Sequence, residues 1–140
     1  MTANAVLLDT NGWIALLNAS DTLHAAADAT WTRLGRRGAS IVVTDWVVAE
    51  TGNGLARTPV RARFVEAVEI VRTSPRATLL SITPTLAERA IALYASRPDK
   101  SWGLVDCASF VVMQDAGIID AFTNDRHYEQ AGFRALLPVL

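Results

Sequence analysis

The sequence predicts an α/β fold, in which a parallel sheet of about five strands is covered by helices on both faces. Short apolar runs, typical of strands that are buried on both faces, alternate along the chain with segments of helical periodicity. This alternation favours a parallel sheet over an antiparallel one. The chain has 140 residues, of which 51% are hydrophobic and 19% charged. These values suit a globular protein with one domain, residues 1–140, and a substantial core.

The first half of the chain contains two predicted strands and four predicted helices. The strands are the apolar runs at residues 6–8 and 41–43. Thr10 and Asn11 are expected to cap the first helix, and Thr44 and Asp45 the third, because short polar side chains favour helix N-termini. Pro59 is expected to open the fourth helix. The four helices are predicted to run to Asn18, over residues 22–37, to about Arg57 and to about Arg72.

The second half repeats the alternation. Strands are predicted at residues 78–82, 118–122 and 133–137. Thr83 and Pro84 begin the next helix, and residues 97–100 form an exposed loop. A long helix over residues 103–116, which Ser101 is expected to cap, ends at Gly117. A short helix over residues 125–130 separates the last two strands.

Charge and cysteine content restrict the cellular setting. The net charge of −1 is not that of a strongly basic nucleic-acid-binding protein. The apolar runs are too short to span a membrane, and the N-terminus lacks the basic region of a signal peptide. A lone cysteine, Cys107, cannot form an internal disulfide and fits a reducing cytoplasm. Five arginines close in sequence, against Glu66 and Glu69, are compatible with an electropositive surface, although a solvated helix face is the simpler interpretation of each one. They are Arg57, Arg61, Arg63, Arg72 and Arg76.

Four acidic residues lie where an apolar core would not place them. Asp9 and Asp125 each follow a buried strand, at the edge of the sheet where open α/β proteins bind ligands. Glu50 and Asp106 lie near the starts of helices, among apolar neighbours, where desolvation of an unpaired carboxylate is costly. Any one of them alone is most simply a helix cap or a surface group. Together, all four can point to one edge of one sheet.

Such a cluster indicates a metal site. Clustered carboxylates repel one another unless a cation neutralises them, and a set of carboxylate oxygens without histidine or cysteine ligands suits hard ions such as Mg²⁺ or Mn²⁺. Metal sites of this kind hydrolyse phosphodiesters, with a metal-bound water as the nucleophile. The pattern therefore predicts a hydrolase that acts on phosphodiester bonds.

Four segments of the sequence resemble the acidic motifs of the PIN-domain nucleases. They are Asp9-Thr10 after an apolar strand, Glu50 on the third helix, residues 101–107 around Asp106, and residues 123–128 around Asp125. The similarity covers nearly the whole chain and is strongest over residues 99–133. Within that family, the chain looks most like the VapC-type toxins of bacterial toxin–antitoxin pairs.

The resemblance implies a cytoplasmic endoribonuclease that depends on Mg²⁺ or Mn²⁺. It also implies an RNA substrate, a cognate antitoxin protein, a homodimer and no membrane association. The catalytic metal ligands would be Asp9, Glu50, Asp106 and Asp125. Thr10 would support the site through its hydroxyl, and Asp99 would be an outer acid. Arg57 and Arg61 would contact the RNA backbone.

Two alternatives remain open at this point. An aspartate-dependent phosphatase of the haloacid-dehalogenase type also has an aspartate after its first strand. That family needs a second aspartate two residues later, however, and this chain has Asn11 there. A metal-binding interaction module, or a PIN-like domain that has lost activity, is the non-enzymatic alternative, and the intact set of four acids argues against it. The two histidines, His24 and His127, are expected to be surface or capping groups.

Overall fold

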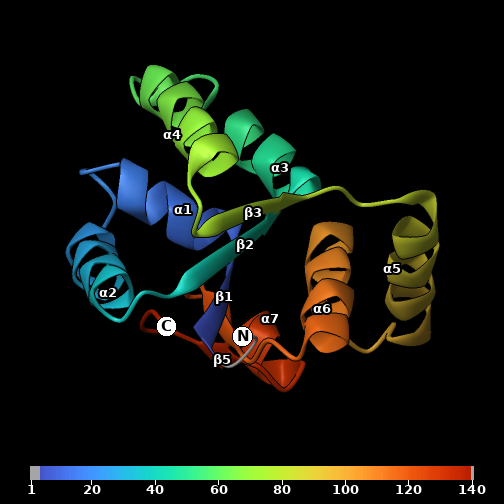
Figure 1. Cartoon of the computed structure of the whole chain (residues 1–140). Coiled ribbons are helices and arrows are strands. Elements are labelled where there is room, and N and C mark those ends of the chain that lie inside the picture. Colours follow the sequence, from blue (N-terminus) through green and yellow to red (C-terminus); the bar gives the residue numbers. More distant parts are fainter. Residues whose placement is uncertain (1–3, 140) are drawn as a thin grey trace.

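The computed structural model describes residues 4–139 and has a five-stranded parallel sheet at its centre (Figure 1). The strand order is β3-β2-β1-β4-β5, and every neighbouring pair is parallel. The predicted fold class is therefore confirmed. The strands are β1 (Ala5–Leu8), β2 (Ser40–Thr44), β3 (Ala77–Leu80), β4 (Asp120–Phe122) and β5 (Arg134–Ala135).

Helices connect each strand to the next. Two helices follow each of the first three strands, and one short helix joins β4 to β5. In the described part of the chain, no helix has the length and hydropathy needed to cross a membrane. The helices are α1 (Thr10–Leu17), α2 (His24–Arg36), α3 (Asp45–Leu55), α4 (Arg61–Thr73), α5 (Pro84–Ser96), α6 (Leu104–Ala116) and α7 (Arg126–Gln130).

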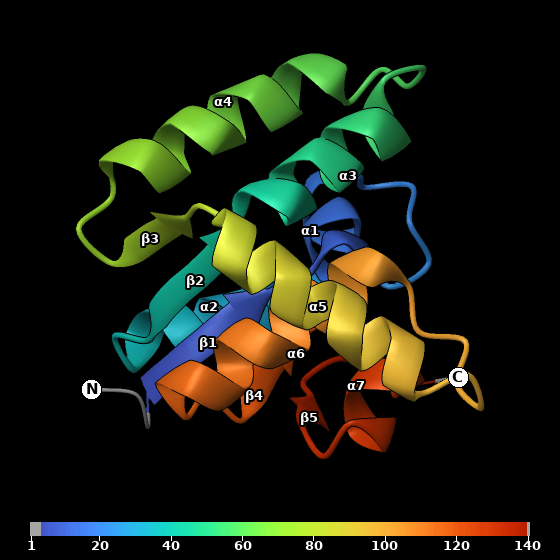
Figure 2. The ribbon, with the colours of Figure 1, turned by 90° about the vertical axis from the view of Figure 1, so that its right-hand side faces the viewer.

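The sheet divides the core into two layers. Along β1, Val6 and Leu8 pack into one apolar cluster and Leu7 into the other, because successive side chains of a strand point to opposite faces. Helices α1 to α4 contribute to the first cluster, whereas α5, α6 and α7 contribute to the second. Figures 1 and 2 show α1 and α2 on the side of the sheet opposite to α5 and α6.

The strand order places a crevice beside β1. From β1 the chain proceeds outward to β2 and β3, and it then returns across the sheet to form β4 on the other side of β1. In open parallel sheets, ligands bind outside the carboxyl ends of the strands at such a reversal of strand order. Here that position lies between the carboxyl ends of β1 and β4, which are followed by Asp9 and Thr123.

Gly12 shows how closely the elements approach one another at this edge. It lies inside α1, where a glycine usually weakens a helix. A Cβ atom at this position would stand 2.1 Å from the carbonyl oxygen of Phe122, the last residue of β4. The glycine is therefore required for α1 to pack against β4, and this packing brings the two strand ends together.

Several predicted helix starts differ from the observed ones. Asp9, not Thr10 or Asn11, is the N-cap of α1, and its side chain makes no capping bond but accepts from Thr123 and Tyr128 instead. Gly103, not Ser101, caps α6. Pro59 precedes α4 in a turn, so it does not open that helix. The cap predicted at Thr44 is confirmed, since its hydroxyl accepts a hydrogen bond from the Val47 amide.

Candidate active site

Asp9 is a buried carboxylate held by two hydroxyl groups. Only 2% of its surface is exposed, and it lies directly after β1. The Thr123 hydroxyl donates to Asp9 Oδ2 at 2.7 Å, and the Tyr128 phenol donates to Oδ1 at 2.9 Å. Each carboxylate oxygen has two lone pairs, so the carboxylate can accept more bonds than these two, and the Thr10 backbone amide is a further partner.

Burial makes the charged form of Asp9 unfavourable. The pKa of Asp9 is raised from 3.8 to about 7, chiefly by desolvation and to a smaller extent by the nearby Asp106 carboxylate, and the hydrogen bonds from Thr123 and Tyr128 limit the rise. Desolvation also raises the pKa of the Tyr128 phenol well above 10, with Asp9 and Asp106 adding to the effect. Tyr128 therefore remains a protonated donor to Asp9 at neutral pH.

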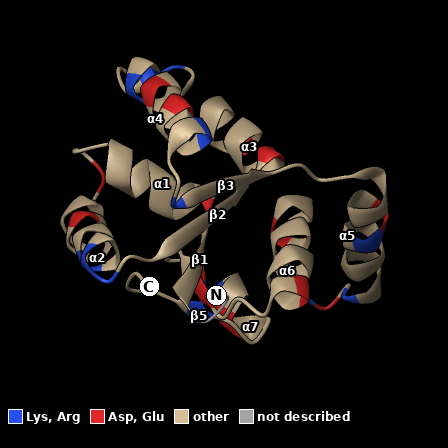
Figure 3. Ribbon diagram, viewed as in Figure 1, with Lys and Arg blue, Asp and Glu red and all other residues tan. Residues whose placement is uncertain are grey.

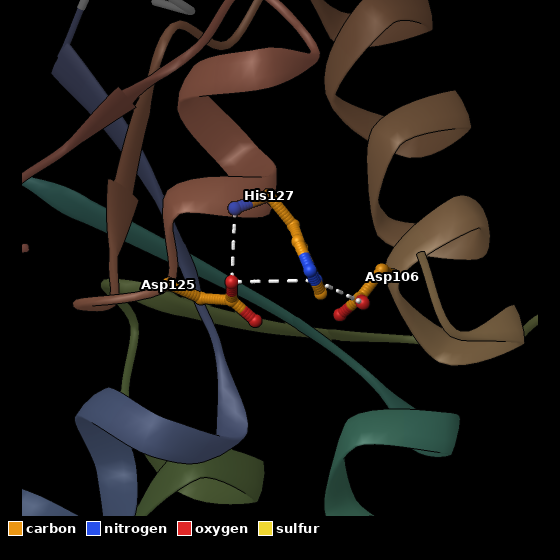
Figure 4. A group of neighbouring side chains, drawn as sticks. All are labelled: Asp106, Asp125 and His127. Carbon is orange, nitrogen blue, oxygen red and sulfur yellow. Dashed lines mark hydrogen bonds and ion pairs between the residues drawn. The ribbon is translucent and has the colours of Figure 1, made fainter. Parts of the chain in front are cut away.

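Asp106, Asp125 and His127 form a compact group beside Asp9. One ligand atom from each lies within 4.8 Å of the others (Figure 4). His127 Nδ1 lies 3.4 Å from Asp106 Oδ2 and 3.3 Å from Asp125 Oδ1. The three side chains are 16–20% exposed, so the group is open to solvent on one side. The ring nitrogen of His127 thus lies between two carboxylates from different elements.

Local backbone geometry fixes these two carboxylates. Asp106 lies in the first turn of α6 and accepts a hydrogen bond from the Gly103 amide at 3.0 Å. Asp125 caps α7 by accepting from the His127 amide at 2.9 Å. Burial raises the pKa of Asp106, and the Asp125 charge adds to the rise, whereas the Gly103 amide and His127 lower it. The site therefore concentrates negative charge, which the neighbouring donors offset only in part.

Glu50 and Thr10, also predicted for the site, lie on α3 and α1. Glu50 is exposed and makes no hydrogen bond or ion pair with any residue between 4 and 139. Its neighbour Thr51 is buried and donates to the Thr10 hydroxyl at 3.2 Å. This bond joins α3 to the start of α1, so Thr10 has a structural contact beside Asp9. The assignment of Glu50 as a ligand stays a prediction.

Asp99 lies outside the group of hydrogen-bonded acids. It is exposed in the loop before α6, where it forms two hydrogen bonds of 3.0 Å with the Arg97 guanidinium. That guanidinium lowers the pKa of the Asp99 carboxyl. Ser101, from the same loop, contacts the other ring nitrogen of His127 at 3.2 Å. The loop therefore reaches the site through Ser101, and a role for Asp99 stays a prediction.

Sequence reasoning did not identify three residues that shape the site. His127 was expected to be a surface or capping group, but it lies between two carboxylates. Thr123 and Tyr128 were not singled out, although both hold Asp9. All three belong to the segment 123–128 that follows β4. Their spacing around Asp125 was the available signal, because one short turn carries all of them to the same strand end.

The donor set fits a divalent cation. Asp106 and Asp125 offer carboxylate oxygens, which suit Mg²⁺ and Mn²⁺, and His127 adds a nitrogen that softer metal ions accept more readily. Asp9 supplies a further charge that is buried without a basic partner among the described residues. Cys107 is a weak candidate, because its thiol is buried and burial raises its pKa.

Residues 6–134 match the PIN domain family. The chain belongs to this family. It is 29% identical over 133 residues to the 23S rRNA-specific endonuclease VapC20 of Mycobacterium tuberculosis, known from strains CDC 1551 and H37Rv. That alignment covers 95% of this chain and 98% of VapC20. The crystal structure of M. tuberculosis VapC20, described as a sarcin–ricin loop cleaving toxin, matches with a TM-score of 0.83 at 28% identity, over 95% of this chain and 99% of that one.

The comparisons confirm the resemblance identified in the sequence, and with it the assignment to the nucleases. They also decide between the two enzymatic interpretations, since the PIN match excludes the phosphatase fold. The PIN assignment agrees with the geometry, because the acidic group lies at the reversal of strand order in the sheet.

Proposed function

We propose that this protein is a metal-dependent endoribonuclease and the toxin of a type II toxin–antitoxin pair, acting in the cytoplasm. The observation that carries the proposal is the meeting of Asp9, Asp106 and Asp125 at the carboxyl ends of β1 and β4. PIN-domain membership and the likeness to VapC20 support the same activity.

Asp9, Glu50, Asp106 and Asp125 are the proposed residues that hold Mg²⁺ or Mn²⁺. When bound, such an ion provides a nucleophilic water at neutral pH and screens the charge that develops on the phosphate. The protein positions the ligands: Thr123 and Tyr128 orient Asp9, and the Gly103 amide orients Asp106. His127 Nδ1 lies between the two acids, 3.4 Å from Asp106 Oδ2 and 3.3 Å from Asp125 Oδ1.

The proposed substrate is RNA, and 23S rRNA is the first RNA to test, because VapC20 is named for that target. The assay incubates the purified protein with a 23S rRNA fragment that contains the sarcin–ricin loop, and with a fragment whose loop is scrambled. Cleavage is expected with Mg²⁺ or Mn²⁺ and not with EDTA, and Asp106→Asn should be inactive. Cleavage in EDTA, or by Asp106→Asn at the wild-type rate, would contradict the proposal, as would the absence of cleavage of any RNA.

Arg57 and Arg61 are proposed contacts to the RNA backbone. Both are exposed near the start of α4, where Figure 3 shows basic and acidic residues intermixed, and Arg61 also donates to the Ala56 carbonyl. Each phosphate contact releases counterions, so binding should weaken with salt. Replacing both residues by alanine should make RNA affinity less dependent on salt concentration. The control is Arg36→Ala, which removes an exposed arginine from α2 and should leave the salt dependence unchanged. An unchanged slope would assign Arg57 and Arg61 to a solvated surface.

We further propose a homodimer that binds a separate antitoxin. The pair of helices α3 and α4 supports this, because Val65 and Ile70 on α4 are 62% and 65% exposed. Apolar side chains with such exposure favour burial against another chain. Light scattering at micromolar concentration should give the mass of two chains, and a monomer would contradict the dimer.

A further inference from the structure

A groove opens beside the acidic site, between the end of α5 and the start of α6. Its volume is about 900 Å³, within the range of sites that hold small ligands. Most residues of the loop 97–103 line it. Among them, Gly103 donates its amide to Asp106, and Ser101 contacts His127. The groove therefore lies next to the acidic site that we assign to catalysis.

The walls of this groove combine exposed apolar groups with positive charge. Ile91 and Tyr94 on α5 are each 53% exposed, and Leu104 on α6 is 37% exposed. Lys100 and Arg97 add two cations, and among the described residues that line the groove there is no carboxylate. The acid of the same loop, Asp99, is bound to Arg97 and is not among the lining residues.

The two cations are held differently. The Arg97 guanidinium lies over the Trp102 ring, 5.2 Å from its centroid, and is also fixed by Asp99. Lys100 forms no ion pair with an acid between residues 4 and 139. Lys100 is therefore the cation that is free to pair with an anion in the groove, whereas Arg97 shapes its wall.

We propose that this groove binds the single-stranded RNA segment next to the cleaved phosphodiester, with a base stacked on Tyr94 and a phosphate paired with Lys100. Single-stranded nucleic acids bind where aromatic platforms accompany positive charge, and these walls provide both. The proposal rests on the nuclease function proposed above, since the groove is assigned to RNA because it adjoins the acids proposed to cleave RNA.

The first test uses the fact that Lys100 is the only lysine of the chain. Asp106→Asn protein, which should bind RNA without cleaving it, is acylated with an amine-reactive ester in the presence and absence of single-stranded RNA. Intact mass and peptide mapping follow Lys100, with the N-terminal amine as internal reference. RNA should slow acylation of Lys100 and leave the reference unchanged. Equal acylation of Lys100 with and without saturating RNA would overturn the proposal.

The second test measures RNA affinity in variants of the same cleavage-deficient protein. Tyr94→Ala should weaken binding about tenfold, within the range for loss of one stacked base, whereas Tyr94→Phe should bind nearly as wild type. Lys100→Ala should weaken binding several-fold and lower the salt slope by about one phosphate contact. The matched control is Arg36→Ala, which removes one exposed positive charge from α2, a helix that does not line the groove.

The outcomes separate this proposal from the general one. If wild-type protein cleaves RNA with metal but Tyr94→Ala and Lys100→Ala bind like Arg36→Ala, the groove proposal is wrong and the nuclease function stands. If no RNA is cleaved by wild type, the nuclease function fails and the groove proposal fails with it. If Tyr94→Ala instead changes the molecular mass in solution while RNA affinity is unchanged, the groove is a contact between copies and the RNA assignment is wrong.

Discussion

Asp9 and Asp125 follow neighbouring strands of the same sheet, yet the protein places them in different environments. Asp9 is 2% exposed and accepts from two buried hydroxyl groups, without a cation among its described partners. The Asp125 side chain is 20% exposed, caps α7 and faces His127. The sequence pattern of an aspartate after an apolar strand is nearly the same in both cases.

The difference follows from what surrounds each strand end. β1 lies in the centre of the sheet, so its end is enclosed by α1, β4 and the turn that carries Thr123 and Tyr128. β4 is next to the short edge strand β5, and the chain after it turns outward into a five-residue helix. One site therefore combines a buried carboxylate, Asp9, with a partly solvated one, Asp125. Substitution of Asp9 should affect metal binding and stability more than substitution of Asp125.

The largest expected effect is the loss of cleavage in Asp9→Asn and in Asp106→Asn. Each substitution keeps the shape of the side chain and removes one charge from the proposed ligand set. The rate should fall on the order of 1,000-fold or more, above the roughly 10–100-fold loss typical when a group that merely supports a ligand is removed. The measurement is RNA cleavage at saturating Mn²⁺. Activity within tenfold of wild type would assign these acids to structural caps.

The second prediction concerns stability without metal. Asp9 has a pKa of about 7 in the folded protein and 3.8 as its ordinary value, so between these pH values the folded state binds more protons than the unfolded state. Stability from this group is therefore greatest below about pH 4 and is lost as the pH rises to about 7. The full difference is roughly 4 kcal/mol. Asp9→Asn removes the cost of the buried charge.

Melting curves in EDTA at pH 5 and pH 8 test this expectation. Asp9→Asn should melt close to wild type at pH 5 and above it at pH 8. The asparagine can keep both contacts, since Tyr128 can accept from its amide and donate instead to the nearby Ser109 hydroxyl, which is buried without a partner among the described residues. Added Mn²⁺ should stabilise wild type more than the variant. A variant that melts far below wild type at both pH values would contradict the electrostatic account.

Particular residues show how much the sequence could predict. The strand–helix alternation predicts the parallel sheet, and the residue pattern singles out four acids, of which Asp106 and Asp125 lie in one group whereas Glu50 is exposed on α3. Strand boundaries are predicted less accurately, because hydrogen bonding between strands sets them. The third strand, for example, is predicted at residues 78–82 but ends at Leu80. A glycine inside a helix is unfavourable by helix propensity, and only the carbonyl oxygen of Phe122 against Gly12 shows why this position requires one.

The two hydrogen-bond donors to Asp9, Thr123 and Tyr128, could not be predicted from the sequence, for a physical reason. Thr123 and Tyr128 are 114 and 119 residues away from it along the chain. A threonine after a strand predicts a turn, and a tyrosine in a short helix predicts core packing. Only the adjacency of β1 and β4, which periodicity does not encode, reveals that both hydroxyls meet one carboxylate.

The third prediction uses Tyr128→Phe to test how far the buried environment of Asp9 depends on its hydroxyl donors. Loss of the phenol hydroxyl removes one of the two donors that hold Asp9 and keeps the ring that packs against Phe110. Supporting groups of this kind typically affect metal affinity by roughly 10–100-fold. Mn²⁺ affinity, measured by calorimetry or thermal shift, should fall by about tenfold. Unchanged Mn²⁺ affinity would mean that the Thr123 hydroxyl alone positions Asp9.

The smallest expected effect is that of Asp125→Asn on the fold. Asparagine is as good an N-cap as aspartate, so the bond from the His127 amide can persist. The melting temperature in EDTA should therefore change little, in contrast to that of Asp9→Asn at pH 8. Removal of the charge also leaves His127 facing Asp106 alone, which should weaken Mn²⁺ binding less than Asp9→Asn does. If Asp125→Asn matched Asp9→Asn in both measurements, the two strand ends would be equivalent, and burial would not be what distinguishes them.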